Sequence, residues 1–276
     1  MAYIQRSLPV LGAFLLLASA QAQSDVSLTL EAKKLAESGS LNGSLGDIKT
    51  AHRMLRKAIE GDSDLAEAHY YLGYAQYQRA IFLVNETEQG QNMLTNQDST
   101  LTFLDESIQN LTKSIKISKK SEITAEAHAL LSMAYGQKIR IRPRKGMVLG
   151  LRSRRNIQKA KTLNANNPRV VLAEAMYRYH TPAPYGGSQE GGLAGFRRAA
   201  DLFSSAEEDS PLLPSWGEVE AYTWLGIACM GADQYEQARH AFEKVLEINP
   251  DYGWVKYSLL PMLQERESRS HQSKFP

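Results

Sequence analysis

The sequence of 276 residues contains a single cysteine, Cys229. A lone cysteine cannot form an internal disulfide, so the fold has to be stabilised by packing. The HExxH, GxSxG and P-loop signatures and cysteine clusters are also missing. The glycines of residues 185–192 lack the spacing and the Lys-Ser/Thr pair of a phosphate-binding loop, and we expect them to form a turn. The sequence therefore predicts no catalytic residue and no enzyme.

The histidines do not form a metal-binding pattern, because no pair spaced four residues apart has a third ligand near it. His69 and His128 end the same tetrapeptide, Ala-Glu-Ala-His. Packing at an equivalent position explains both of them. We expect neither a metal nor another cofactor.

Long hydrophobic runs are absent, and the most apolar segment is short. Arg6 precedes the apolar residues 8–18, and small residues follow at Ala20 and Ala22. A basic start, a short apolar core and an A-x-A site are the layout of a secretory signal peptide. A membrane anchor is the alternative, but spanning a bilayer needs about 20 apolar residues. We predict that residues 1–22 are a signal peptide, and that the mature chain lacks a transmembrane segment and is periplasmic or extracellular.

Acidic residues are absent between Ala127 and Ala173, although the whole chain has a formal net charge of only +2. The arginines of this stretch that we consider as partner contacts are Arg140, Arg142, Arg144, Arg152, Arg154 and Arg155. Such asymmetry creates a local positive potential that attracts an acidic protein segment, an anionic glycan or lipid headgroups. Nucleic acid is not expected, because the chain is predicted to be exported and no aromatic residues alternate with the cations. A solvated helix face without a partner is the alternative interpretation.

The sequence does contain an internal repeat, whose clearest copy begins at Val219. Its apolar or small positions are Tyr222, Leu225, Gly226, Ala238, Phe242 and Pro250. Residues three and four apart share a helix face, so the spacing predicts two helices that approach closely at Gly226 and Ala238. Ser215 followed by Glu218 has the spacing of a capping box and is expected to begin the first helix.

This spacing resembles the tetratricopeptide repeat, a helix–turn–helix unit of about 34 residues. Cys229 and Val245 replace the usual aromatic residue and alanine. Leu72 and Gly73 mark a weaker, earlier copy. The predicted hairpins cover residues 25–65, 66–121, 122–167, 168–210 and 211–252, followed by a closing helix at 253–265 and a polar, disordered tail at 266–276.

The resemblance implies an all-α fold, a right-handed α-solenoid of about five hairpins with a C-terminal capping helix, over residues 23–265. It further implies a scaffold that binds a protein or peptide on a concave surface lined by the first helix of each hairpin. Tyrosines, which are favoured at interfaces, recur on those helices and are candidate contacts: Tyr70, Tyr74, Tyr77, Tyr135 and Tyr177. The alternative is a solute- or small-molecule-binding accessory subunit, for example of a transporter, with a pocket among the inserts at 83–99 and 180–192.

Overall fold

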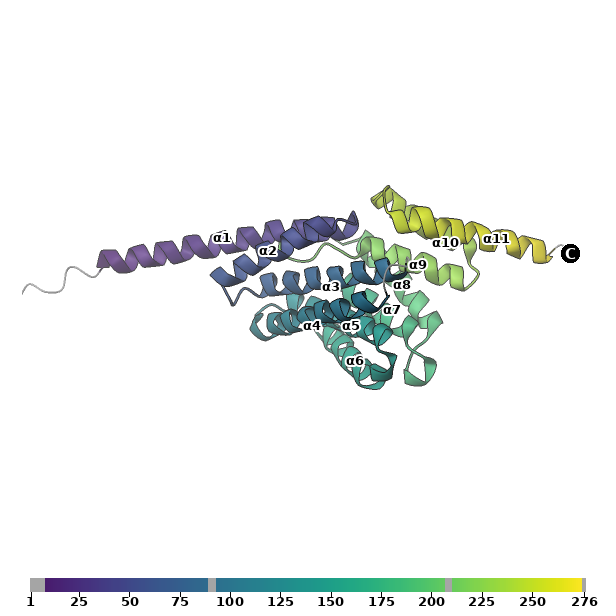
Figure 1. Ribbon diagram of the computed structural model, residues 1–276, viewed down its shortest axis with the longest axis horizontal. Coiled ribbons are helices and arrows are strands. Elements are labelled where there is room, and N and C mark those ends of the chain that lie inside the picture. Colours follow the sequence, from purple (N-terminus) through teal and green to yellow (C-terminus); the bar gives the residue numbers. More distant parts are fainter. Residues whose placement is uncertain (1–7, 89–92, 207–209, 275–276) are drawn as a thin grey trace, which may run out of the picture.

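The computed structural model describes residues 8–88, 93–206 and 210–274, and the regular secondary structure within these ranges is entirely helical (Figure 1). The helices form consecutive pairs: α1 (Leu8–Leu41) with α2 (Leu45–Gly61), α3 (Ala66–Glu88) with α4 (Met93–Ile117), α5 (Ser121–Ile141) with α6 (Gly146–Leu163), α7 (Pro168–His180) with α8 (Gln189–Ser204), and α9 (Glu218–Gly231) with α10 (Tyr235–Ile248). Each second helix also packs against the first helix of the next pair. The chain is therefore an α-solenoid, and the five predicted hairpins are confirmed.

The second helices are amphipathic, as expected for the outer layer of a solenoid. In α2 the buried residues are Ile48, Ala51, Leu55 and Ala58, which lie on one helix face. Ser44 begins this helix by accepting a hydrogen bond from the Asp47 amide at 3.3 Å. Because only one face is apolar, α2 is stable only when it packs against its neighbours.

The two helices of the fifth hairpin approach closely where the sequence predicted. Phe242 is completely buried, and a Cβ atom added to Gly226 would lie 2.3 Å from Cε1 of its ring. Any larger side chain at position 226 would have to push the ring aside. The glycine is therefore required for this helix contact.

The two inserts lengthen helices or form a turn where the structure describes them. Helices α3 and α4 are 23 and 25 residues long, so the described part of the 83–99 insert lengthens both helices, while residues 89–92 lie outside the described ranges. Residues 181–188 form a turn containing a short 3-10 helix, Ala183–Tyr185. Ser188 then begins α8 by accepting a hydrogen bond from the Gly191 amide at 2.9 Å.

The closing helix is longer than expected. It starts with a π-helical turn, Val255–Leu259, and continues as α11 (Leu260–Lys274). The prediction of a disordered tail from residue 266 is therefore wrong for residues 266–274. The polar residues there are compatible with a helix because it carries ion pairs, such as Arg239 with Glu267 at 2.5 Å.

The N-terminal part of α1 extends beyond the other helices in Figure 1. Ala22, Gln23 and Ser24 are exposed, and Asp25 is the first buried residue among those of α1 whose side chains are described. Across the helices that the structure describes, none combines the length and hydropathy needed to cross a bilayer.

The first and last hairpins contact each other. Leu41, at the end of α1, packs against the apolar core of the C-terminal helices. The side-chain amide of Asn249, which follows α10, donates a hydrogen bond to the Leu41 carbonyl at 2.8 Å. The end of α1 thus contacts the C-terminal hairpin as well as its own partner helix, α2.

Candidate functional site

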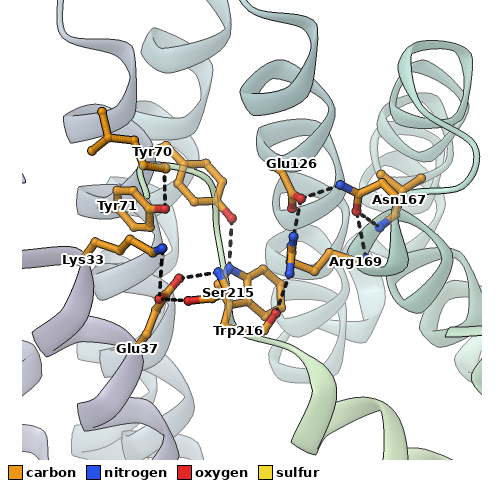
Figure 2. Close-up of polar contacts among 11 residues, drawn as sticks. Lys33, Glu37, Tyr70, Tyr71, Glu126, Asn167, Arg169, Ser215 and Trp216 are labelled. Atoms are coloured by element: carbon orange, nitrogen blue, oxygen red, sulfur yellow. Dashed lines mark hydrogen bonds and ion pairs between the residues drawn. The ribbon is translucent and has the colours of Figure 1, made fainter. Parts of the chain in front are cut away.

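The connection between α8 and α9 includes Ser210–Gly217, which begins with a turn and lies against the first helices (Figure 2). The first helices concerned are α1, α3, α5 and α7. We call Ser210–Gly217 the inner segment, and we call the surface made by those four first helices the first-helix surface. Lys33 of α1 donates to the Pro211 carbonyl at 2.9 Å, and the Tyr71 hydroxyl of α3 donates to the Leu212 carbonyl at 2.8 Å. Side chains of the first helices thus bind the backbone of the inner segment.

Ser215 anchors the inner segment to α1. Its amide donates to Oε1 of Glu37 at 3.0 Å, and its hydroxyl donates to Oε2 at 2.6 Å. The prediction that Ser215 caps a helix is wrong, because the residue preceding α9 is Gly217, with φ of 118°. Burial raises the pKa of Glu37, while Lys33 at 3.8 Å and the two bonds from Ser215 oppose the rise.

Trp216 is the main apolar contact of the inner segment and is only 7% exposed. Its ring stacks on Tyr74 with the centroids 5.3 Å apart, and its Nε1 donates to the Tyr70 hydroxyl at 3.0 Å. Burial raises the pKa of both phenols, so they remain neutral. Tyr70, Tyr74 and Tyr77 are buried, which contradicts their assignment as contacts for an external partner.

A buried ion pair secures the same region from the side of α5 and α7. Nε of Arg169 donates to Oε1 of Glu126 at 2.8 Å, and these side chains are 11% and 2% exposed. The Asn167 amide donates to the same oxygen at 2.5 Å, and Arg169 also donates to the Trp216 carbonyl at 3.0 Å. Burial by itself lowers the pKa of Arg169, but Glu126, Tyr70 and Glu37 together outweigh this effect and raise it. Arg169 therefore stays charged and ties the inner segment to two hairpins.

A second region, on the outside of the array, is open to solvent. A groove of about 790 Å³ runs between α5 and α6 and is lined by the side chains of Thr124, His128, Tyr135, Arg152, Arg155, Asn156, Gln158, Lys159, Thr162 and Leu163. Nδ1 of His128 lies 2.7 Å from Oδ1 of Asn156. Burial and the nearby Lys159 lower the pKa of His128, so the positive charge of the groove comes from its arginines and its lysine.

The basic residues of this region divide into paired and unpaired ones. Lys138 pairs with Asp105, Arg142 with Asp98 and Lys161 with Glu174. The exposed cations that form no ion pair with any residue in the described ranges are Arg144, Lys145, Arg152, Arg154, Arg155 and Lys159. Their charge is therefore not neutralised within the described part of the protein.

The other residues predicted to contact a partner do not lie together in the structure. Tyr135 lines the α5–α6 groove, whereas the Tyr177 hydroxyl donates to the Tyr185 carbonyl at 3.5 Å in the 181–188 turn. Arg140 is exposed near the end of α5. The pKa of His180 is lowered mainly by burial, and the charge of Arg140 lowers it further. The structure thus brings Tyr135 together with Arg152 and Arg155, and it leaves Tyr177 apart from them.

Sequence reasoning missed an aromatic cluster beside the 180–192 insert. The Trp224 ring lies 4.9 Å from His180 and 6.2 Å from Trp254, measured between centroids. Trp254 is 44% exposed. These residues come from the end of α7, from α9 and from the start of the closing helix, so their spacing in the sequence gives no signal. No group of three or more His, Cys, Asp or Glu side chains suited to a metal ion occurs among the residues that are described.

Comparison with protein families matches residues 219–252 to the tetratricopeptide repeat. These residues include α10, the preceding turn and nearly all of α9. Residues 219–252 therefore form a tetratricopeptide repeat. A sequence comparison with curated proteins finds no match.

Solved structures show the same repeat fold. TTC0263, a thermophilic tetratricopeptide repeat protein of Thermus thermophilus, has a TM-score of 0.54 and 16% identity, over 85% of this chain and 98% of that one. The HusA haemophore from Porphyromonas gingivalis has a TM-score of 0.50 and 20% identity, over 70% and 92%. The APC/C hetero-tetramer Cut9-Hcn1 has a TM-score of 0.51 and 14% identity, over 91% of this chain and 42% of that one. At these identities the similarity concerns the fold.

Proposed function

We propose that this tetratricopeptide repeat protein is an exported, non-enzymatic scaffold that binds an acidic segment of a protein partner in the α5–α6 groove. The observation that carries the proposal is the set of unpaired cations on one wall of the groove, Arg152, Arg155 and Lys159. A groove of one charge sign concentrates partners of the opposite sign and speeds their association. Tyr135 adds an aromatic contact of the kind enriched at interfaces.

The inner segment supports the choice of this groove over the first-helix surface. An external peptide on that surface would have to replace the contacts of Trp216 and Ser215, which are already made within the chain. The α5–α6 groove needs no such displacement. We therefore place the partner outside the region that the family resemblance implies.

Export rests on the basic start, apolar core and small-residue site of residues 1–22. Removal of these residues would leave every buried side chain that is described for α1 in place, because Asp25 is the first of them. The exported chain would consequently retain the packing between α1 and α2.

Charge reversal tests the proposed groove. We expect the triple variant Arg152→Glu, Arg155→Glu and Lys159→Glu to bind a fluorescein-labelled decaglutamate peptide at least about tenfold more weakly, since each exposed charge pair contributes up to about 1 kcal/mol. Fluorescence anisotropy measures the affinity, and added salt should weaken binding to the unmodified protein.

The matched control carries the same change in net charge at exposed lysines elsewhere, in Lys34→Glu, Lys49→Glu and Lys57→Glu. This control should bind the peptide within about twofold of the unmodified protein. Its substituted charges lie on α1 and α2 and do not line the groove, so salt screens their effect on a peptide bound there. Equal loss in both variants would show that net charge, and not the groove, attracts the peptide.

A small-molecule site is the second candidate, and the His180, Trp224 and Trp254 cluster favours it because flat aromatic ligands stack on such rings. HusA is named a haemophore, so hemin is a suitable probe. If the cluster is a site, hemin should quench tryptophan fluorescence, and His180→Ala with Trp254→Ala should weaken binding at least about tenfold, the effect of losing about 1.4 kcal/mol. His240→Ala, an exposed histidine on α10, is the control and should bind as the unmodified protein does.

A further inference from the structure

The tip of the α5–α6 hairpin exposes large apolar side chains. Met147, Val148 and Leu151, in the first turns of α6, are 73%, 57% and 53% exposed. Leu151 lies four positions after Met147 and three after Val148, so it shares a helix face with each of them and the three form one patch. The opposite side of α6 is buried through Leu149, Ser153, Ile157 and Ala160. The apolar patch therefore faces away from the protein.

Cations flank this patch on the same hairpin tip. Arg144 and Lys145 lie in the 3-10 turn Pro143–Lys145 just before α6, and Arg154 lies about one turn after Leu151. All three are exposed and form no ion pair with described residues. The nearest acidic positions in the sequence are Glu126 and Glu174, and both are engaged in ion pairs.

We propose that this hairpin tip docks on an anionic phospholipid surface. Met147, Val148 and Leu151 enter the boundary between headgroups and acyl chains, and Arg144, Lys145 and Arg154 bind lipid phosphates. Apolar side chains flanked by lysine and arginine are the features that hold peripheral proteins at an anionic membrane. We call these six side chains the docking tip.

The placement of the patch favours a membrane over an acidic protein. The apolar residues lie at the end of a hairpin at the margin of the molecule, where α6 is seen in Figure 1. None of them lines the α5–α6 groove, to which α6 contributes Arg152, Arg155 and Lys159 further along the helix. A protruding apolar tip fits a fluid surface that can close around it. The docking tip and the groove use different side chains. The proposal of lipid docking can therefore be disproved without affecting the proposal of peptide binding, and the reverse also holds.

Vesicle flotation tests the docking tip. A chain starting at Gln23 keeps the apolar residues 8–18 out of the assay and retains every described buried residue of α1. We expect it to bind vesicles in which about a third of the lipid is phosphatidylglycerol and to bind pure phosphatidylcholine at least about tenfold less, because each basic residue near an anionic surface adds about 1 kcal/mol. The full-length chain is assayed in parallel.

Two variants separate the apolar and the electrostatic contributions. Met147→Ser with Val148→Ser and Leu151→Ser, and separately Arg144→Ser with Lys145→Ser and Arg154→Ser, should each reduce binding at least about tenfold. All these side chains are exposed, so the circular dichroism spectrum should not change. The controls Met262→Ser and Lys49→Ser with Lys57→Ser alter exposed residues on α11 and α2 and should bind within about twofold of the parent chain.

Three outcomes would overturn the proposal. Equal binding to both kinds of vesicle would exclude recognition of anionic lipid, and unchanged binding of the two tip variants would exclude the docking tip. Absence of vesicle binding, together with dimers that Leu151→Ser dissociates in sedimentation experiments, would assign the patch to a second copy of the chain. The decaglutamate assay does not depend on any of these results.

Discussion

Replacing Arg169 with alanine is expected to lower the free energy of unfolding by about 3 to 5 kcal/mol. The change leaves the Glu126 carboxylate, which is 2% exposed, without its cation. Oε2 of Glu126 already has no hydrogen-bond partner among the described residues, so the charge would be poorly compensated. The Trp216 carbonyl would lose its donor as well. Denaturant unfolding followed by circular dichroism measures the loss.

Two comparisons identify the cause of that loss. Arg178→Ala breaks an exposed pair with Glu174 and should cost no more than about 1 kcal/mol. Adding Glu126→Gln to Arg169→Ala should restore part of the stability, because a neutral amide is less costly to bury without a cation. A loss below about 1 kcal/mol for Arg169→Ala would show that the pair is not needed to hold the inner segment.

Replacing Trp216 with alanine should have an effect of similar size, a loss of about 3 to 5 kcal/mol. The substitution removes the ring that stacks on Tyr74 and leaves a cavity in the core of the N-terminal hairpins. Trp216→Phe keeps most of the packing but not the bond to Tyr70, and should cost less. Thermal or denaturant unfolding of the unmodified protein and the two variants ranks their stabilities.

Trp254→Ala is the matched control for this experiment. The Trp254 side chain is 44% exposed, so its removal should change the stability by less than about 1 kcal/mol. If Trp216→Ala were equally mild, the inner segment would be a loosely attached loop, and the first-helix surface would then be accessible to a partner. The stability data thus also bear on where the partner binds.

The helices and their order could be read from local pattern. Apolar residues at helical spacing, such as Ile48, Ala51 and Leu55, predict one buried face whatever the neighbours are. Gly226 similarly predicted a close helix contact that the structure confirms. These local patterns predict the structure correctly because each repeat packs mainly against itself and the neighbouring repeat.

The candidate site could be predicted only in part. The cations of residues 144–159 are visible because they are close together in the sequence, and the structure leaves them exposed. The tyrosines of α3 were misassigned because a first helix of a solenoid usually has one face open. Here the inner segment covers that face, through contacts such as Trp216 with Tyr70 that join residues 146 positions apart.

The sequence by itself determined the helical hairpins, their number, the acid-free basic stretch and the absence of the catalytic signatures considered above. These properties depend on residue type and on spacings within one repeat. Only the tertiary structure decided that the inner segment fills the first-helix surface, that the end of α1 contacts the C-terminal hairpin, and which of the described cations remain unpaired. Each of these depends on contacts between distant segments, where a serine such as Ser215 has the local signature of a helix cap and yet binds Glu37 of α1.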